Sequence, residues 1–213
     1  MKGLFHPDSR LMRILITACN LVILNLLWIL TSLPIVTMGA SNSAMYAVIF
    51  QFLDDGSDSV ILPYFRAFRA NFKQSTIVWI PMALVTAILV IDALYIVNND
   101  VSALLWIPFA LVLLVLLAMT SYVFGLIPRF ENSLRDILRN SLLIFLMNII
   151  PSLSMILVQG IPLLFFFFLP SFFLRIGILW LGFGVSLFSY VNGSTMLRIF
   201  KKYLPKETEA AEV

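Results

Sequence analysis

Three aspartates, Asp54, Asp55 and Asp58, fall within the five-residue stretch DDGSD. Prenyl-transfer enzymes use pairs of such acidic motifs, because metal ions must clamp a diphosphate from two sides. No second aspartate-rich motif follows here, and Gly56 and Ser57 favour a turn. We therefore interpret the stretch as a solvated loop and expect a protein that is not an enzyme.

The remaining reactive side chains are sparse. His6 is the single histidine and Cys19 the single cysteine, which excludes histidine relays, multi-histidine metal sites and an internal disulfide. The residues before Cys19 read ITAC, which is similar to a lipoprotein cleavage site, but the preceding apolar stretch is too short for a signal peptide. We expect a structural cysteine, no cofactor and no metal ion.

The composition indicates whether water or lipid surrounds this chain. Of its 213 residues 61% are hydrophobic and only 12% are charged, and the mean hydropathy is +1.01. About a quarter of the residues of a soluble domain are charged. Lipid must therefore surround much of the surface, and a folded basic face for a nucleic acid is not expected.

Flanking charges divide the apolar sequence into membrane spans. We predict an all-α polytopic protein with one transmembrane domain, residues 1–203, and a mobile tail, residues 204–213. Six spans are predicted, at 14–33, 35–53, 75–97, 101–127, 141–159 and 176–197. Pro162, Pro170 and Arg175 interrupt the last apolar region, so we interpret 162–175 as a re-entrant or interfacial segment.

The basic residues orient these spans. With the N-terminus inside, thirteen of the fourteen lysines and arginines fall on the inner side, and Arg175 alone falls outside. This asymmetry fits the positive-inside rule and predicts that both termini are cytoplasmic. Asp92 and Arg175 are the charges inside apolar regions, and we expect them to pair or to lie at the outer interface.

Two stripes precede the third predicted span. Arg66, Arg69 and Lys73 follow helical spacing, and Phe65, Phe68 and Phe72 repeat it one residue earlier. This pattern predicts an amphipathic helix at 62–74 on the cytoplasmic interface, with rings among acyl chains and cations on phosphates. Residues 134–146 align with 68–80 without gaps, which suggests a repeat and a second interfacial helix at 129–140. Two interpretations of these helices remain: they anchor the chain at the membrane surface, or they form a docking site for a cytoplasmic partner.

Two further patterns lie in the first two spans. Asn20, Asn25, Trp28 and Ser32 share one face of the first span, which indicates either interhelical hydrogen bonds or a substrate pathway. After Pro34, which leaves almost no loop, small residues at a four-residue spacing predict close helix packing. The candidate packing residues are Pro34, Gly39, Ser43 and Ala47.

Four separated blocks resemble the YesL-like family of bacterial membrane proteins, which carries a domain of unknown function. The blocks are NLLWILTSLPIVTMGASNSAMYAV (25–48), FRAFRANFKQSTIVW (65–79), PRFENSLRDILRNSLL (128–143) and SYVNGSTMLRIFKKY (189–203). The resemblance spans essentially the whole chain and implies a multi-pass protein of the bacterial cell membrane. Members are typically encoded near carbohydrate importers of the ATP-binding-cassette (ABC) type, so it implies by association a role in sugar uptake.

The resemblance therefore implies, by association, a non-catalytic accessory component of a sugar importer. Its partners are then membrane lipids and the permease subunits of the importer. Arg129, Phe130 and Glu131 are the candidate partner contact, because local charge and family resemblance coincide there. The alternative is a small transporter or channel that works as a homo-oligomer.

Overall fold

The computed structural model describes residues 10–54, 56, 59–99, 104, 106–168, 171, 177 and 180–203. These ranges contain helices and no strands, which confirms the all-α prediction for the described part of the chain. The helices are α1 (Arg10–Ser32), the 3₁₀ turn η1 (Ile35–Thr37), α2 (Met38–Asp54), α3 (Ile61–Asn98), α4 (Trp106–Arg129), α5 (Leu134–Met147), α6 (Ile149–Phe168), the π-helix η3 (Trp180–Gly184) and α8 (Val185–Phe200).

Three of these helices are long and apolar enough to cross a membrane, within α1, α3 and α4. The pair α5 and α6 supplies a fourth candidate if its two bent halves count as one span. The chain is thus compatible with a membrane protein, but the structure does not clearly show the six spans that were predicted. The difference arises at the short helices, because 17 residues of α2 measure only about 26 Å.

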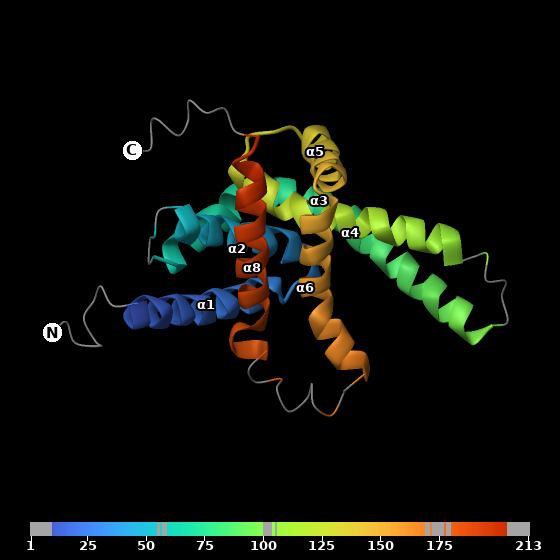
Figure 1. Ribbon diagram of the computed structural model, residues 1–213, viewed down its shortest axis with the longest axis horizontal. Helices are drawn as coiled ribbons and strands as arrows, with labels where there is room; N and C mark the ends of the chain where they lie inside the picture. The colour runs from blue at the N-terminus through green and yellow to red at the C-terminus, as the bar shows by residue number, and fades with distance from the viewer. Residues whose placement is uncertain are drawn as a thin grey trace.

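Helix α2 lies at the centre of the helices rather than at their outer edge (Figure 1). It packs against α1, α3, α4 and α8, and ten of its residues are buried. Gly39 shows how closely α3 approaches α2. A Cβ atom at residue 39 would lie 2.5 Å from the Cβ of Trp79 and 2.7 Å from the backbone oxygen of Ser75. Small side chains on α2 therefore permit backbone approach, as in other membrane helix pairs.

Helix α3 corrects the predicted break between an interfacial helix and the third span. The structure has one helix of 38 residues across both segments, with Pro81 inside it. Such a helix is about 57 Å long, well beyond the hydrocarbon thickness of about 30 Å. The basic N-terminal part is a direct extension of the apolar part, because neither glycine nor proline separates residue 74 from residue 75.

The predicted fifth span, 141–159, is not one straight helix. Helices α5 and α6 meet at a bend of 105° around Asn148. The Asn148 side chain donates hydrogen bonds to the Ile144 oxygen at 3.0 Å and to the Tyr203 hydroxyl at 2.9 Å, which hold the corner. Pro151 then occupies the first turn of α6, where its missing N–H costs no hydrogen bond.

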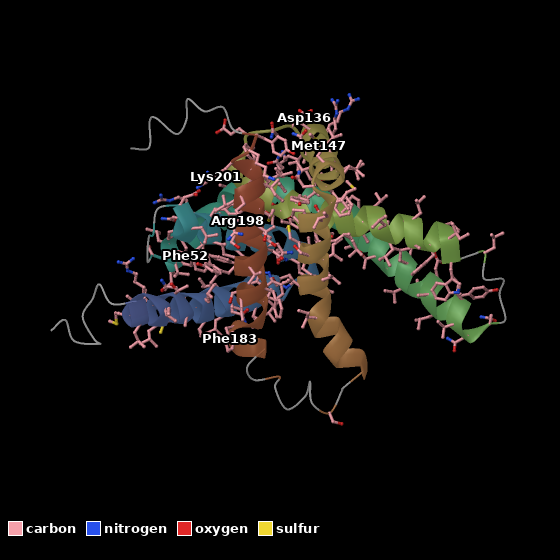
Figure 2. All side chains as sticks on the ribbon, viewed as in Figure 1. Phe52, Asp136, Met147, Phe183, Arg198 and Lys201 are labelled. Atoms are coloured by element: carbon pink, nitrogen blue, oxygen red, sulfur yellow. The ribbon has the colours of Figure 1, made fainter. Side chains whose placement is uncertain are left out.

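The aligned segments 68–80 and 134–146 are thus both helical but continue differently. Ser75 and Ser141, which align with each other, are both fully buried. Beyond this point α3 runs straight on, whereas α5 ends at Met147. Figure 2 shows Asp136 and Met147 on α5, above the long vertical α6. The helical correspondence therefore covers the whole aligned segment, and the two helices differ only beyond it.

The last apolar region differs from its prediction in part. Residues 162–168 continue α6, while most of 169–176 lies outside the described residues. The predicted sixth span at 176–197 corresponds to η3 and α8, which end at Phe200. The tail from residue 204 onward also lies outside the described residues.

The outer halves of α3 and α4 form a two-helix arm that extends away from the other helices (Figure 1). We call residues 84–98 and 106–117 the arm. Leu89 is its single buried residue, whereas side chains such as Ile91 and Ile107 are 65% and 66% exposed. The arm therefore presents apolar side chains on nearly all sides.

Candidate functional site

The polar face of α1 is joined to the neighbouring helices by hydrogen bonds. The Trp28 indole donates to Asn42 Oδ1 at 2.8 Å, and Thr31 Oγ1 lies 2.6 Å from the Tyr64 hydroxyl. The fully buried Asn25 accepts the backbone N–H of Ser186 at 3.0 Å, at the start of α8. Each of these contacts links α1 to another helix, as the interhelical interpretation expects.

The other two residues of that face are placed differently. Asn20 and Ser32 are half-buried, and the Ser32 hydroxyl has no hydrogen-bond partner in the described part of the chain. The small residues of α2 meet α3 instead, where Ser75 Oγ donates to Ser43 Oγ at 2.7 Å. Pro34 precedes η1, and its carbonyl accepts the Thr37 N–H at 2.9 Å, which closes the tight link between α1 and α2.

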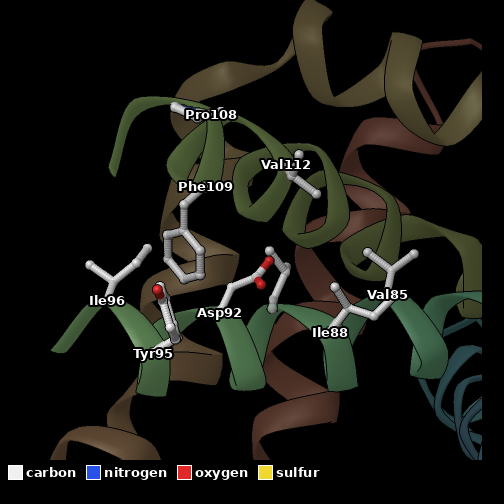
Figure 3. Close-up of a pocket in the computed structure, with 9 residues that line it drawn as sticks. Val85, Ile88, Asp92, Tyr95, Ile96, Pro108, Phe109 and Val112 are labelled. Atoms are coloured by element: carbon white, nitrogen blue, oxygen red, sulfur yellow. The ribbon is translucent and has the colours of Figure 1, made fainter. Parts of the chain in front are cut away.

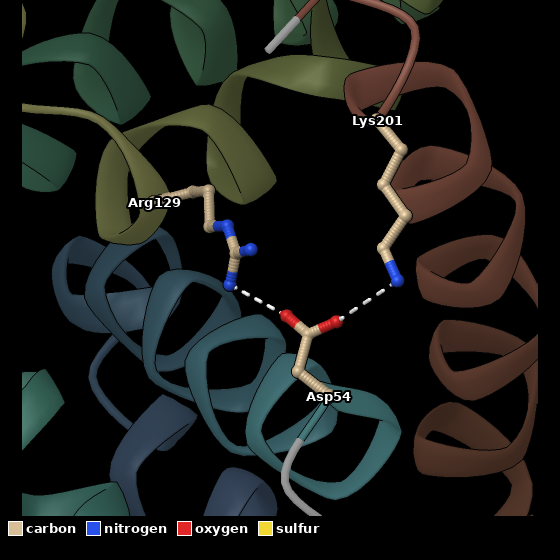
Figure 4. A network of polar contacts seen from close by, with 3 residues as sticks. All are labelled: Asp54, Arg129 and Lys201. Carbon is tan, nitrogen blue, oxygen red and sulfur yellow. Dashed lines mark hydrogen bonds and ion pairs between the residues drawn. The ribbon is translucent and has the colours of Figure 1, made fainter. Parts of the chain in front are cut away.

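Asp54 connects three helices at one end of the core (Figure 4). Its Oδ2 lies 2.7 Å from Arg129 Nη1 at the end of α4, and its Oδ1 lies 3.6 Å from Lys201 Nζ just after α8. The Asp54 side chain is only 16% exposed and that of Arg129 is 28% exposed. Water therefore screens this ion pair less than a fully exposed one.

This arrangement changes the interpretation of two predicted features. Asp54 is the last residue of α2 and is paired, rather than part of a solvated loop. The Arg129 guanidinium, predicted to contact a partner protein, already has an intramolecular carboxylate. A carboxylate at a helix C-terminus is unfavourable beside the negative end of the helix dipole. That local conflict was the signal in the sequence that Asp54 needs cations nearby.

A polar groove lies next to this cluster, between α2, α3 and the end of α4. Its volume is about 560 Å³, and Gln51, Arg66, Asn71, Gln74, Arg129 and Glu131 supply its polar lining. Gln74 Nε2 donates to the Asn132 oxygen at 2.8 Å, which ties α3 to the segment after α4. The groove thus joins residues from both predicted amphipathic segments.

The predicted interfacial stripes take up distinct positions on α3. Arg66, Arg69 and Lys73 are all exposed, but only Arg66 lines the polar groove. Phe68 is half-buried, and its ring stacks on that of Tyr64 with 6.4 Å between the ring centroids. The Phe72 ring lies edge-on to the Phe68 ring, with 5.6 Å between the centroids. The cations therefore remain on the surface while the rings pack partly on one another.

The other two candidate contact residues, Phe130 and Glu131, also differ in their exposure. The Phe130 ring packs edge-on against Phe200 at 5.5 Å and joins the main core cluster. Glu131 is exposed and lines the polar groove. Of the three, only Glu131 is exposed without an ion pair within the described residues.

Asp92 is an exposed residue of the arm, on the side of α3 that faces α4 (Figure 3). It lines a pocket of about 410 Å³ together with apolar and aromatic side chains of α3 and α4, among them Tyr95 and Phe109. Figure 3 shows its carboxylate directed from α3 toward α4. Its expected partner Arg175 lies outside the described residues. A carboxylate in apolar surroundings is an unusual feature of a membrane helix.

Within the described ranges no group of three or more histidine, cysteine, aspartate or glutamate side chains could hold a metal ion. Lys201, which the sequence-based interpretation did not single out, proves to be part of the Asp54 cluster.

Comparison with known proteins adds one relationship. No curated protein and no solved structure shows a significant match to this chain. Residues 21–93, a region that contains most of α1, all of α2 and most of α3, match the family described as "Protein of unknown function, DUF624".

Proposed function

We propose that this protein is a non-catalytic membrane component that docks onto the permease of an ABC-type carbohydrate importer through its arm. The exposed arm is the observation that supports this proposal. Leu94 and Leu111, one on each helix, are 60% and 64% exposed. Two helices that contact mainly each other have most of their packing surface free for another membrane helix, and packing is what drives association in lipid.

The link to carbohydrate uptake comes from the resemblance to the YesL-like proteins and their association with sugar importers. The structure supplies the compatible physical property, which is an apolar surface of the right kind for a second membrane protein. Placing the protein in the bacterial cell membrane is part of the same proposal.

Photocrosslinking tests this proposal directly. A benzophenone amino acid at Ile91, Leu94 or Leu111 should crosslink to a permease subunit in cells, because these side chains leave the arm outward. The matched control places the same group at Ile14 or Leu30 of α1, which are 68% and 60% exposed but lie outside the arm. Crosslinked bands are identified by mass spectrometry.

The outcomes separate the candidates. A permease adduct from both arm and α1 positions indicates contact without a specific arm surface. Adducts only to lipid at the arm contradict docking. Adducts to a second copy of this chain favour the alternative function, a small homo-oligomeric transporter. For that alternative Asp92 is the supporting observation, because an intramembrane carboxylate often marks an ion pathway.

We further propose six membrane crossings with both termini cytoplasmic. Six crossings require all four long candidates, including the bent pair of α5 and α6. The shorter crossings are then α2 and the unit of η3 with α8. Residues 180–200 provide 21 helical residues, and α2 with 17 stands at the lower limit for a span. The strong bias of basic residues supports this orientation.

Cysteine labelling tests this orientation. Cys19 is first replaced by serine, and single cysteines are placed at Asn99 or at Glu209. A membrane-impermeant maleimide should label intact spheroplasts at residue 99 and should label residue 209 only after lysis. Labelling of both positions before lysis contradicts the proposed topology.

A further inference from the structure

The polar groove carries two charged side chains that form no ion pair with the described residues. Arg129 is neutralised by Asp54, which also lies 3.6 Å from Lys201. Arg66 on α3 and Glu131 after α4 line the same groove, and neither forms an ion pair within the described residues. Within the described part of the chain, a cation and a carboxylate without ion pairs therefore line a common volume of about 560 Å³.

The walls that hold these charges are fixed by hydrogen bonds. The Gln74 amide holds the Asn132 carbonyl at 2.8 Å, one residue after Glu131. The Asn71 amide nitrogen donates to the Ala67 oxygen at 3.0 Å on its own helix. The side-chain amide nitrogens of Gln74 and Asn71 are thus both engaged in hydrogen bonds. The side-chain oxygen of Asn71 takes no part in these bonds and is available as an acceptor beside the groove.

Because the groove contains both a cation and a carboxylate, it disfavours a ligand whose charge is of only one sign. A simple anion bound at Arg66 would meet the carboxylate of Glu131, and a simple cation at Glu131 would meet the guanidinium of Arg66. A ligand with both charges satisfies both groups. Arginine binds phosphate oxygens through two parallel hydrogen bonds, whereas a primary ammonium donates to carboxylate and amide oxygens.

We propose that the polar groove binds a phosphoethanolamine group, with its phosphate at Arg66 and its ammonium at Glu131 and Asn71. The group comes from a membrane phospholipid headgroup or from the free phosphomonoester, which share this chemistry. Phe65 and Phe72 on the same helix are 42% and 39% exposed, which suits a site beside acyl chains. The inference stands independently of the proposed importer contact.

Native mass spectrometry of the full-length protein in mild detergent tests the site. Phosphatidylethanolamine, phosphatidylglycerol and phosphatidylcholine are added in turn, and bound lipid is counted. Wild type should retain phosphatidylethanolamine best, because phosphatidylglycerol lacks the ammonium and the methyl groups of phosphatidylcholine block its hydrogen bonds. Arg66→Gln should lower retention of phosphatidylethanolamine about threefold or more, as expected for a partly solvated charge contact.

Glu131→Gln should remove the preference for phosphatidylethanolamine over phosphatidylglycerol. The matched control is Arg69→Gln, since Arg69 is exposed on the same helix but does not line the groove. If Arg66→Gln and Arg69→Gln retain lipid equally, or if Glu131→Gln leaves the preference unchanged, the proposal is wrong.

Free phosphoethanolamine is added as a competitor to separate the two sources. Displacement of the lipid at millimolar competitor assigns the groove to the headgroup chemistry alone and allows a soluble ligand. Retained lipid, together with the Arg66 and Glu131 effects, assigns the site to the membrane lipid, whose acyl chains then contribute to binding.

Discussion

Gly39→Ala is expected to lower the midpoint of thermal unfolding of the purified protein by about 2–12 °C. The added Cβ would lie 2.5 Å from the Trp79 Cβ and 2.7 Å from the backbone oxygen of Ser75, so α2 and α3 must move apart. Overpacking of this kind typically costs about 1–3 kcal/mol, and each kcal/mol shifts the midpoint of a chain this size by about 2–4 °C. The measurement is the temperature at which half of the protein leaves the monodisperse peak in gel filtration.

Two other glycines provide the controls for this experiment. A Cβ at Gly125 would collide even more closely with the Met196 methyl group, but that group is the end of a flexible side chain, so Gly125→Ala should cost less. A Cβ at Gly160 would meet nothing within 4 Å, and Gly160→Ala should be neutral or slightly stabilising in a helix. Equal midpoints for Gly39→Ala and Gly160→Ala would contradict the close packing of α2 on α3.

Movement at Gly39 has a further consequence. The Trp79 indole donates to the Ile35 oxygen at 2.7 Å, next to the tight link between α1 and α2. A shift of α3 that accommodates a larger residue 39 weakens this bond as well. Gly39→Val should therefore be more destabilising than Gly39→Ala, because both of its added methyl groups need space.

Asp54→Asn is expected to destabilise the protein by about 1–2 kcal/mol, a value between those of exposed and buried ion pairs. The substitution keeps the shape of the side chain but removes the charge that holds the ends of α4 and α8 near α2. The same gel-filtration midpoint measures the effect. Glu131→Gln, the same chemical change at an exposed carboxylate without an ion pair, is the matched control and should have little effect on stability.

A double-mutant cycle tests the pairing itself. Asp54→Asn combined with Arg129→Gln should cost less than the sum of the two single changes, because each single change leaves one charge without its partner. Additive losses would show that Asp54 and Arg129 do not interact in solution. Retained stability in Asp54→Asn alone would show the same for the whole cluster.

The Asp54 cluster also affects how Arg129 can be used to test partner binding. Lysine lacks the planar fork that arginine offers to a carboxylate, so Arg129→Lys would be a natural test of a partner contact at this residue. In the structure that fork meets Asp54 of the same chain at 2.7 Å. A lower recovery of permease with Arg129→Lys is therefore ambiguous unless the stability of the variant is measured in parallel, and crosslinking at the arm is the cleaner test.

The course of α3 shows how far local patterns reach. Periodicity correctly indicated helix for residues 62–74 and 75–97, but the change of composition between them suggested a corner. No residue type that breaks a helix stands at that point, so the helix continues. At Asn148 the opposite happened: the apolar sequence runs through the corner. Pro151 cannot donate a hydrogen bond to the Met147 carbonyl there, and the Asn148 side chain contacts Tyr203, 55 residues away.

By itself the sequence determined the all-α fold class of this protein and the location of most of its helices. Hydropathy, helical spacing and the bias of basic residues are properties of neighbouring residues, so they can be evaluated along the chain. The tertiary structure decided which apolar helix is surrounded by other helices, as α2 is, and which charges meet. Asp54 and Arg129 are 75 residues apart and become partners only because α2 and α4 pack side by side. Burial and ion pairing depend on such distant contacts, whereas helix formation depends mainly on local ones.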